Sequence, residues 1–332
     1  RTDWEQCDDW IIELSDEEIQ ELKEAVSLSK AVPIVEMSAG SFTLPTFASR
    51  IRELQNELIY GRGFVVLRGL PVDEWDRESS ARAYYGIGCH LGVPVSQNAQ
   101  GHLLGHVYDL GLDPMNPVNR VYQTNYRQLF HTDSTDIVGL LCLQPARSGG
   151  QSSICSSSTV YHEIAECRPD LLRVLCQRFH IDRKGETPEG DDETYEMAVF
   201  YPDEERVTCI YARDFIDAAQ RHPHIPPLTT EQMDALSLMD QLASSDDLRL
   251  DIDFLPGDIQ FLHNHQILHA RTSYTDWPEA ERRRHLLRLW LSTPDGRSLP
   301  SDFEARYGKI EPGQPRGGIR VPGATFQAPL EP

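Results

Sequence analysis

The sequence is poor in cysteine and has no long apolar run. Its seven cysteines are an odd number at scattered positions, which fits neither a disulfide framework nor a zinc site. We therefore expect free thiols in a reducing compartment. No run approaches the roughly 18 apolar residues of a membrane span, and the opening residues lack the layout of a signal peptide. A soluble protein is expected, with the cytoplasm as the default location.

Basic residues are also in the minority, with 31 Lys and Arg against 52 Asp and Glu and a net charge of -21. They form no long stripe, so nucleic acid is not an expected partner. A composition with 39% hydrophobic residues in 332 positions suffices for one sizeable core. We expect a helical segment over 1–60 that packs on the core, a main domain over 61–295 and a Pro/Gly-rich tail over 296–332. The composition is compatible with a homo-oligomer.

The periodicity of apolar residues predicts a β core with added helices. A Ser15 N-cap with acidic residues behind it begins the first helix. Helices are predicted over 16–29, 44–59, 77–91, 159–178 and 229–244. Strands are predicted over 64–70, 121–124, 137–143, 250–254, 260–263 and 286–292. Residues 183–195 are acidic and carry Gly and Pro, a composition typical of a mobile surface loop or lid.

One His-x-Asp stretch, His131-Thr132-Asp133, has the spacing of a metal site. In an extended segment residues i and i+2 point to the same side, so His131 and Asp133 can reach one ion. A distal imidazole, His269, would complete one face of an octahedron and leave three positions open. Such a set suits ferrous iron.

Other histidines compete for these roles. His180-Ile181-Asp182 repeats the motif, but its context indicates a helix exit into the acidic loop, which argues against a metal site. Near the distal position, His263 and His265 lie close to His269 in the sequence, and His263 is the leading substitute. Half-buried structural histidines would give the same pattern.

Two arginines, Arg284 and Arg288, are four residues apart and would share one face of a strand. Leucines occupy the opposite face, so the arginines are expected to point into the core. A planar guanidinium matches a carboxylate through two parallel hydrogen bonds. Either arginine could therefore bind the far carboxylate of a 2-oxo acid whose other end chelates iron.

Taken in order, these motifs resemble the TauD/TfdA family of Fe(II)/2-oxoglutarate-dependent dioxygenases. The resemblance covers roughly 61–292 and rests on Gly63–Pro71, Phe130–Asp133, Gly149–Ser152, Gly257–Asp258, His269–Arg271 and Arg284–Arg288. It implies a mainly β fold with flanking helices (α+β), built on a double-stranded β-helix, or jelly-roll.

The resemblance also implies roles for single residues. Iron would be held by His131, Asp133 and His269, and 2-oxoglutarate by Arg284 together with Ser152, which stands where the family often has Thr. Arg288 corresponds to a position that often holds an anionic group of the substrate. Three further candidates for the substrate pocket flank the ligands in sequence: Tyr122, Asn125 and Asn264.

The expected activity is that of an oxidoreductase that uses Fe(II), 2-oxoglutarate and O2. It would hydroxylate, desaturate or cyclise a small polar substrate, carboxylate-bearing or amino-acid-like, and release succinate and CO2. Two alternatives stay open. One is a jelly-roll oxygenase or demethylase that acts on a protein tail, for which Lys would be expected in place of Arg284; the other is a catalytically silent metal-binding β-helix.

Overall fold

The computed structural model describes residues 9–113, 116, 119–188, 190–319, 323 and 325–332. Its α-helices are α2 (Asp16–Ser29), α3 (Phe47–Tyr60), α4 (Arg77–Leu91), α5 (Ser157–Cys167), α6 (Pro169–Leu175), α7 (Arg213–Ala219), α8 (Thr230–Ala243) and α9 (Glu304–Tyr307). Its strands are β1 (Ile11–Glu13), β2 (Phe64–Arg68), β3 (Val93–Pro94), β4 (Leu104–Val107), β5 (Gln128–His131), β6 (Ile137–Gln144), β7 (Ser148–Gly149), β8 (Ser152–Ser156), β9 (Phe179–Asp182), β10 (Thr194–Met197), β11 (Phe200–Pro202), β12 (Val207–Cys209), β13 (Arg249–Ile252), β14 (Ile259–His263), β15 (Ile267–Arg271), β16 (Tyr274–Thr275) and β17 (His285–Ser292).

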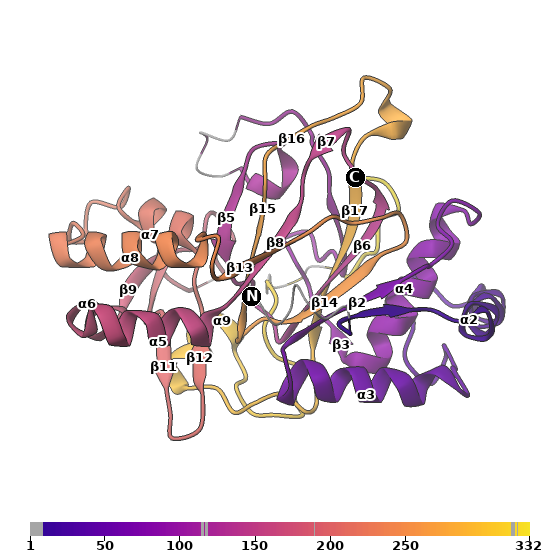
Figure 1. Cartoon of the computed structure of the whole chain (residues 1–332), viewed down its shortest axis with the longest axis horizontal. Helices are drawn as coiled ribbons and strands as arrows, with labels where there is room; N and C mark the ends of the chain where they lie inside the picture. The colour runs from indigo at the N-terminus through magenta and orange to yellow at the C-terminus, as the bar shows by residue number, and fades with distance from the viewer. Residues whose placement is uncertain (1–8, 114–115, 117–118, 189, 320–322, 324) are drawn as a thin grey trace.

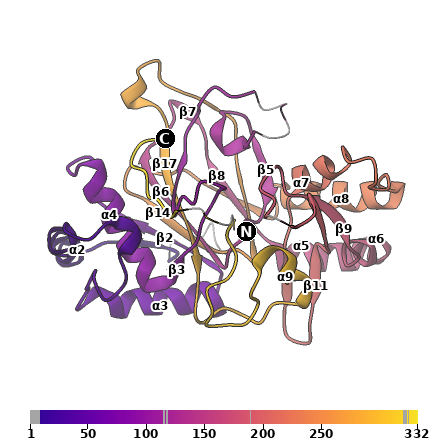
Figure 2. The same ribbon diagram turned by 180° about the vertical axis from the view of Figure 1, so that it is seen from behind.

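Two sheets form the centre of the molecule. The larger has the order β1-β2-β14-β6-β17-β3, with β4 also paired to β17, and the smaller has the order β13-β8-β15-β5. Helices α2, α3 and α4 lie on one side of these sheets and α5 to α8 on the other (Figure 1), and the view from behind shows the same separation (Figure 2). The strand order and the two-sheet arrangement are those of a jelly-roll.

Successive side chains of a strand point to opposite faces of the sheet, so every second residue of a strand lies between the two sheets. On β2, Phe64 and Val66 pack with Ile154 and Ile252 of the smaller sheet. Their neighbours Val65 and Leu67 join the cluster under the N-terminal helices. The layer between the sheets is therefore built by every second residue.

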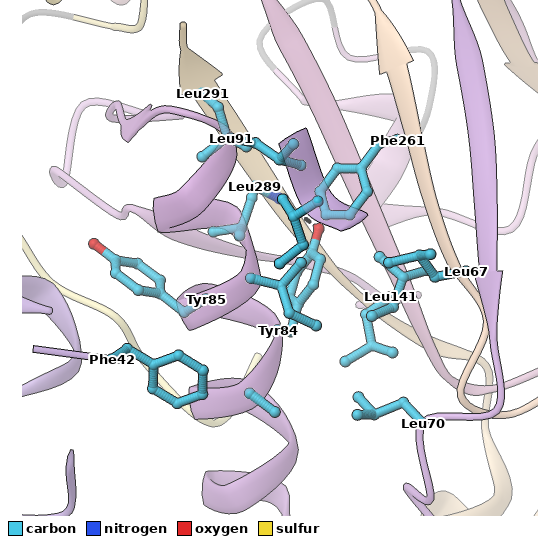
Figure 3. Packing of buried hydrophobic residues seen from close by; sticks show 14 of the residues in the cluster. Phe42, Leu67, Leu70, Tyr84, Tyr85, Leu91, Leu141, Phe261, Leu289 and Leu291 are labelled. Atoms are coloured by element: carbon cyan, nitrogen blue, oxygen red, sulfur yellow. Dashed lines mark hydrogen bonds between the residues drawn. The ribbon is translucent and has the colours of Figure 1, made fainter. Parts of the chain in front are cut away.

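Strand β17 follows the same rule. Its leucines at 287, 289 and 291 face the N-terminal helices, and Figure 3 shows Leu289 near Tyr84 and Leu291 near Leu91, both residues of α4. The Tyr84 hydroxyl accepts a hydrogen bond from the Leu289 amide at 3.1 Å. The alternate residues Leu286 and Trp290 pack between the sheets, and Arg288 shares their face. The predicted inward direction of Arg288 is confirmed.

A second core lies outside the smaller sheet. It joins Phe130 of β5 and Leu268 of β15 to apolar residues of α5, α6 and α8. This helical layer follows the β8 strand in sequence and covers the sheet that carries the predicted metal ligands.

Three predicted elements differ from the structure. Residues Val121–Gln123 form a 3-10 turn instead of a strand, because the Thr124 amide and hydroxyl both bond the Val121 carbonyl; the strand that reaches His131 is β5. The helix predicted over 159–178 breaks at Pro169, which has no amide to continue it and begins α6 instead. Helix α3 starts at Phe47 instead of 44, since Pro45 disfavours helical backbone in the residue before it.

The first helix begins as predicted. Ser15 accepts a hydrogen bond from the Glu18 amide while Glu18 accepts one from the Ser15 amide, which is a capping box. The six cysteines in the described residues are free, and Cys7 lies outside them. Within the same residues, no helix has the length and apolar character needed to span a bilayer.

Candidate active site

Strands β5 and β15 bring the predicted ligands together. His131 and His269 are direct partners in the antiparallel pairing of these strands, and their ring centroids are 4.2 Å apart. Asp133 follows β5, with carboxylate oxygens 3.8 Å from His131 Nε2 and 3.6 Å from His269 Nε2. One donor atom from each side chain lies within 4.8 Å of the others, and no other such group of three occurs in the described residues.

The charge states of this group suit a cation. His131 Nδ1 lies 2.8 Å from the Leu129 carbonyl, to which it can only donate, so its proton sits there and Nε2 keeps a lone pair. Burial and the neighbouring His269 ring lower the pKa of His131 to about 4. Burial alone would raise the pKa of Asp133, but Arg288 and the two imidazoles outweigh it and hold that pKa below its usual range. A neutral imidazole and a carboxylate are thus present at neutral pH.

Neighbouring side chains fix the direction of Asp133. Trp290 donates from Nε1 to one carboxylate oxygen at 2.8 Å, and Arg288 Nη1 lies 3.8 Å from the same oxygen. The backbone of Asp133 is held by Asn264, whose side chain accepts from the Asp133 amide at 2.7 Å and donates to its carbonyl at 2.6 Å. The carboxylate has little freedom to turn away from the imidazoles.

A narrow pocket beside His269 is rich in unsatisfied donors. It is lined by Ser152, Arg271 and Arg284, among others. Among the described residues, Arg284 Nη1 is buried without a partner, as are Nε and Nη1 of Arg271. Both guanidinium groups lie over the Tyr274 ring, at 5.2 and 4.9 Å. Burial lowers the pKa of Arg284, and burial together with the Arg284 charge lowers that of Arg271 to about 10. Buried cations of this kind need an anion.

A larger cavity of about 580 Å³ opens on the other side of the three donors. Arg288 lies on its wall, with the guanidinium 4.5 Å from the Tyr122 ring centroid, and Gln97 accepts from Arg288 Nε at 2.7 Å. Glu186, from the predicted lid segment, lines the cavity and forms an ion pair with Arg120. The far wall is mostly apolar and includes Ile181, Met197, Val199, Ile210 and Phe215.

Two residues predicted to contact substrate lie elsewhere. Asn264 is fully buried, and its side chain is used entirely on the backbone of Asp133 and Thr135. Its role is to position Asp133. Asn125 is absent from the described residues that line the cavity, and its carbonyl accepts from the Tyr274 amide. Both predictions relied on closeness in sequence, which does not determine side-chain direction.

The competing histidines have structural partners. His265 lies 3.1 Å from Asp136, and His263 lies against Arg297 at 3.4 Å. In the second His-x-Asp copy, Asp182 pairs with Arg221 and His222 at 2.6 and 3.0 Å. The expected helix exit at His180 was wrong, because β9 continues through Asp182. Each of these histidines therefore has a partner within the protein, although Nε2 of His263 and Nδ1 of His265 are buried without one among the described residues.

Sequence reasoning missed several residues of the site. Trp290 could have been found, since it shares the inward face of β17 with Arg288 at a spacing of two. Gln128, whose side-chain amide nitrogen lies 3.0 Å from His131 Nε2, and Gln97 carry no recognisable motif. Arg271 is the last residue of the distal motif His269–Arg271, and only the fold shows that it reaches the pocket of Arg284.

Comparison with known proteins agrees with this geometry. Residues 24–290 match the model of the taurine catabolism dioxygenase TauD, TfdA family. The chain is 28% identical to FR-33289 synthase of Streptomyces rubellomurinus over 88% of its own length and 87% of that protein. It is 30% identical to a taurine hydroxylase-like protein of Stachybotrys chartarum, over 85% of this chain and 75% of the other.

Solved structures show the same fold. An asparagine oxygenase in complex with Fe(II), 3-hydroxyasparagine and succinate superposes with a TM-score of 0.66 at 19% identity, over 88% of this chain and 98% of the other. The non-heme iron oxygenase OrfP with Fe and alpha-ketoglutaric acid gives 0.63 at 14% identity, over 85% and 94%. These enzymes share the double-stranded β-helix predicted from the sequence. The chain therefore belongs to the TauD/TfdA family and is an oxidoreductase dependent on Fe(II), 2-oxoglutarate and O2.

Proposed function

We propose that His131, Asp133 and His269 hold the ferrous ion. The observation that carries this is their convergence from two adjacent strands onto one point of the cavity wall. Two imidazoles and one carboxylate form the facial set that non-haem iron oxygenases use, with further positions open to ligands. The lone pair on His131 Nε2 and the low pKa of Asp133 support the same assignment.

The narrow pocket supports binding of 2-oxoglutarate by Arg284 and Ser152. Arg284 is 3% exposed, and its Nη1 has no partner in the part of the chain that the structure describes. Ser152 is buried on the same wall and donates its hydroxyl to Gln260 at 3.1 Å. A distal carboxylate placed there would satisfy buried donors that otherwise cost stability. The pocket also borders His269, which connects it to the metal group.

The substrate is proposed to be a small polar molecule with a carboxylate or another anionic group, oxidised at a C–H bond. Arg288 and Tyr122 on the cavity wall support this, because Arg288 has no carboxylate partner beyond the distant contact with Asp133 in the described residues. Relatives are consistent with it: one is a uridine-5'-phosphate dioxygenase, and the solved neighbours hold hydroxylated asparagine or arginine.

The protein's part in the reaction is to position the reactants and exclude water. Bound iron and 2-oxoglutarate supply the oxidising chemistry, in which O2 is consumed, succinate and CO2 are released and a substrate C–H bond is oxidised. Trp290 and Asn264 keep Asp133 in place, and Leu129 fixes the ring of His131. Hydroxylation, desaturation or ring closure then depends on which C–H bond Arg288 and the apolar wall present.

The assignment of Arg284 is tested by Arg284→Gln with Arg282→Gln as the control. Both remove one positive charge, but Arg282 is about half exposed and lies over the Trp277 ring away from the pocket. Loss of a charge-assisted bidentate contact should weaken 2-oxoglutarate binding about 100-fold in the first variant. Anaerobic calorimetry on the iron-loaded protein measures this. Equal affinity in both variants would refute the assignment.

A further inference from the structure

The cavity wall next to Asp133 carries an arginine that no motif indicated. Arg306 lies on α9, beyond the region that matches the family. It is 9% exposed, and it lines the cavity together with Ser134. Its Nε donates to Ser134 Oγ at 2.7 Å. Within the described residues, its two terminal nitrogens have no hydrogen-bond partner and the guanidinium forms no ion pair.

Other buried arginines outside the two pockets are compensated. Arg316 pairs with Asp136 at 2.8 Å and bonds two carbonyls as well. Arg297 has no carboxylate partner among the described residues and its Nε is buried without a partner, but its terminal nitrogens contact four neutral groups, including the Val207 carbonyl. Arg306 has a single neutral acceptor, Ser134, within the described ranges. Because Arg306 lines the cavity, an anionic ligand there would be the natural partner of its unpaired terminal nitrogens.

We propose that Arg306 binds an anionic group of the substrate, as a second anion subsite distinct from Arg288. The inference rests on the proposed function, since it takes this cavity as the substrate site. The two arginines are anchored at adjacent residues: Arg288 lies 3.8 Å from the carboxylate of Asp133, and Arg306 bonds the hydroxyl of Ser134. Their terminal nitrogens can each hold a carboxylate, phosphate or sulfonate.

The substrate class that follows is an organic dianion. One anionic group would lie at Arg288 and the other at Arg306, and the carbon skeleton between them would pass the metal group at Asp133. The apolar residues across the cavity, such as Met197 and Val199, suit that skeleton. A volume of about 580 Å³ falls in the range of roughly 300–1,000 Å³ that holds drug-sized ligands, so two charged ends and a linker have room.

The test uses protein loaded with Fe(II) and saturating 2-oxoglutarate without oxygen, so that the pocket of Arg284 is filled. Calorimetry compares inorganic phosphate, sulfate and acetate with O-phospho-L-serine, which carries two anionic groups. Wild type should bind O-phospho-L-serine more tightly than any of the three simple anions. The order of the affinities for phosphate, sulfate and acetate shows which oxyanion the subsites prefer. Arg306→Gln should weaken O-phospho-L-serine binding about tenfold, the loss expected for a charge-assisted contact.

Matched variants separate this from a loss of structure. Arg178→Gln removes the same charge from an arginine that is 59% exposed and paired with Asp302, and it should leave affinity unchanged. Arg306→Lys should keep part of the affinity. If Arg306→Gln does not fold, Ser134→Ala, which removes only the anchor, should still weaken binding by about two- to fivefold.

The outcomes distinguish a failure of the proposed function from a failure of the second anion subsite. If iron and 2-oxoglutarate do not bind, the proposed function itself is wrong. If they bind normally but Arg306→Gln binds O-phospho-L-serine as wild type does, only the second subsite is overturned. Wild type that binds none of the four probes would overturn it too.

Discussion

The chain contains two copies of His-x-Asp. The two copies differ in whether a third donor lies nearby, in whether they face a cavity, and in the partners of the carboxylate. At His131 and Asp133, a third donor from the adjacent strand completes a group that faces a cavity. At His180 and Asp182, the carboxylate is fully buried and takes bonds from Arg221 and from the Lys184 amide. The first copy keeps its donor atoms available for a ligand, whereas the second uses its carboxylate to hold β9 against the turn that follows α7.

This difference shows that the motif alone does not specify chemistry. Asp182 neutralises cations of the protein itself, so a metal would have to displace them. Apart from the two imidazoles, the Asp133 carboxylate contacts Trp290 and the more distant Arg288 in the described part of the chain, and both leave the imidazoles free to share an ion. What separates the copies is the partner strand, since β15 supplies His269 opposite His131, whereas β10 places Glu196 opposite His180.

The largest expected contrast comes from removing one imidazole of each copy. His131→Ala should abolish turnover and weaken Fe(II) binding more than about 100-fold, because even outer-shell changes cost 10- to 100-fold in metal affinity. His180→Ala, whose ring lies only 3.4 Å from Glu196 at the surface, should change neither. Metal content after dialysis and succinate release would measure both. Comparable losses of turnover and Fe(II) binding in the two variants would contradict the assignment of different roles to the two copies.

A subtler change tests the support of Asp133. Trp290→Phe keeps the aromatic ring but removes the hydrogen bond from Nε1 to the carboxylate. Iron affinity should fall about tenfold, the lower end for loss of such a contact. A competitive titration with a metal-binding dye would reveal it. Unchanged affinity would mean that the geometry of Asp133 does not depend on Trp290.

A substitution in the second His-x-Asp copy should lower the stability of the protein and leave its activity unchanged. Asp182→Asn leaves Arg221 and His222 without their carboxylate, and a buried group deprived of its partner costs about 1–3 kcal/mol. The lower half of this range is expected because Arg221 is 37% exposed. Denaturant unfolding gives the free energy, and iron affinity of the folded protein should match wild type. Loss of iron binding in this variant would contradict the structural role.

The smallest effect is the dependence of that stability on pH. Burial alone would raise the pKa of Asp182, but hydrogen bonds from Lys184, Arg221 and His222 outweigh it and lower the pKa. The stabilisation is therefore complete above the unfolded pKa of about 3.9 and is lost as the pH falls through the lower folded pKa. The difference in unfolding temperature between wild type and Asp182→Asn should shrink from pH 6 to pH 3. A difference in unfolding temperature that stays constant between pH 6 and pH 3 would show that the stabilisation does not come from the ionised Asp182 carboxylate.

The sequence specified most of the site through short patterns. Alternation on β17 correctly placed Arg288 opposite the leucines, and the i, i+2 spacing brought His131 and Asp133 to one side. It could not tell His269 from His263 or His265, because that choice depends on which strand lies beside β5. It also could not show that the Asn264 side chain bonds the backbone of Asp133 and Thr135, or that Asn125 is absent from the described residues that line the cavity.

The elements were predicted well where the signal is local. The capping box at Ser15 and the glycine-bounded strand at Phe64 need no tertiary information. The errors at Val121 and Pro169 came from turn hydrogen bonding and from a single proline inside an apolar pattern. Arg306 was beyond reach, because its importance depends on a tail helix that returns to Ser134.

The most direct test of the central claim is an anaerobic titration with Fe(II) and 2-oxoglutarate, followed by the weak visible charge-transfer band of the metal complex. Wild type and His180→Ala should develop the band at the same concentrations, and His131→Ala should not develop it at all. A normal band in His131→Ala, or none in wild type with iron bound, would contradict the assignment of His131, Asp133 and His269 as the iron site.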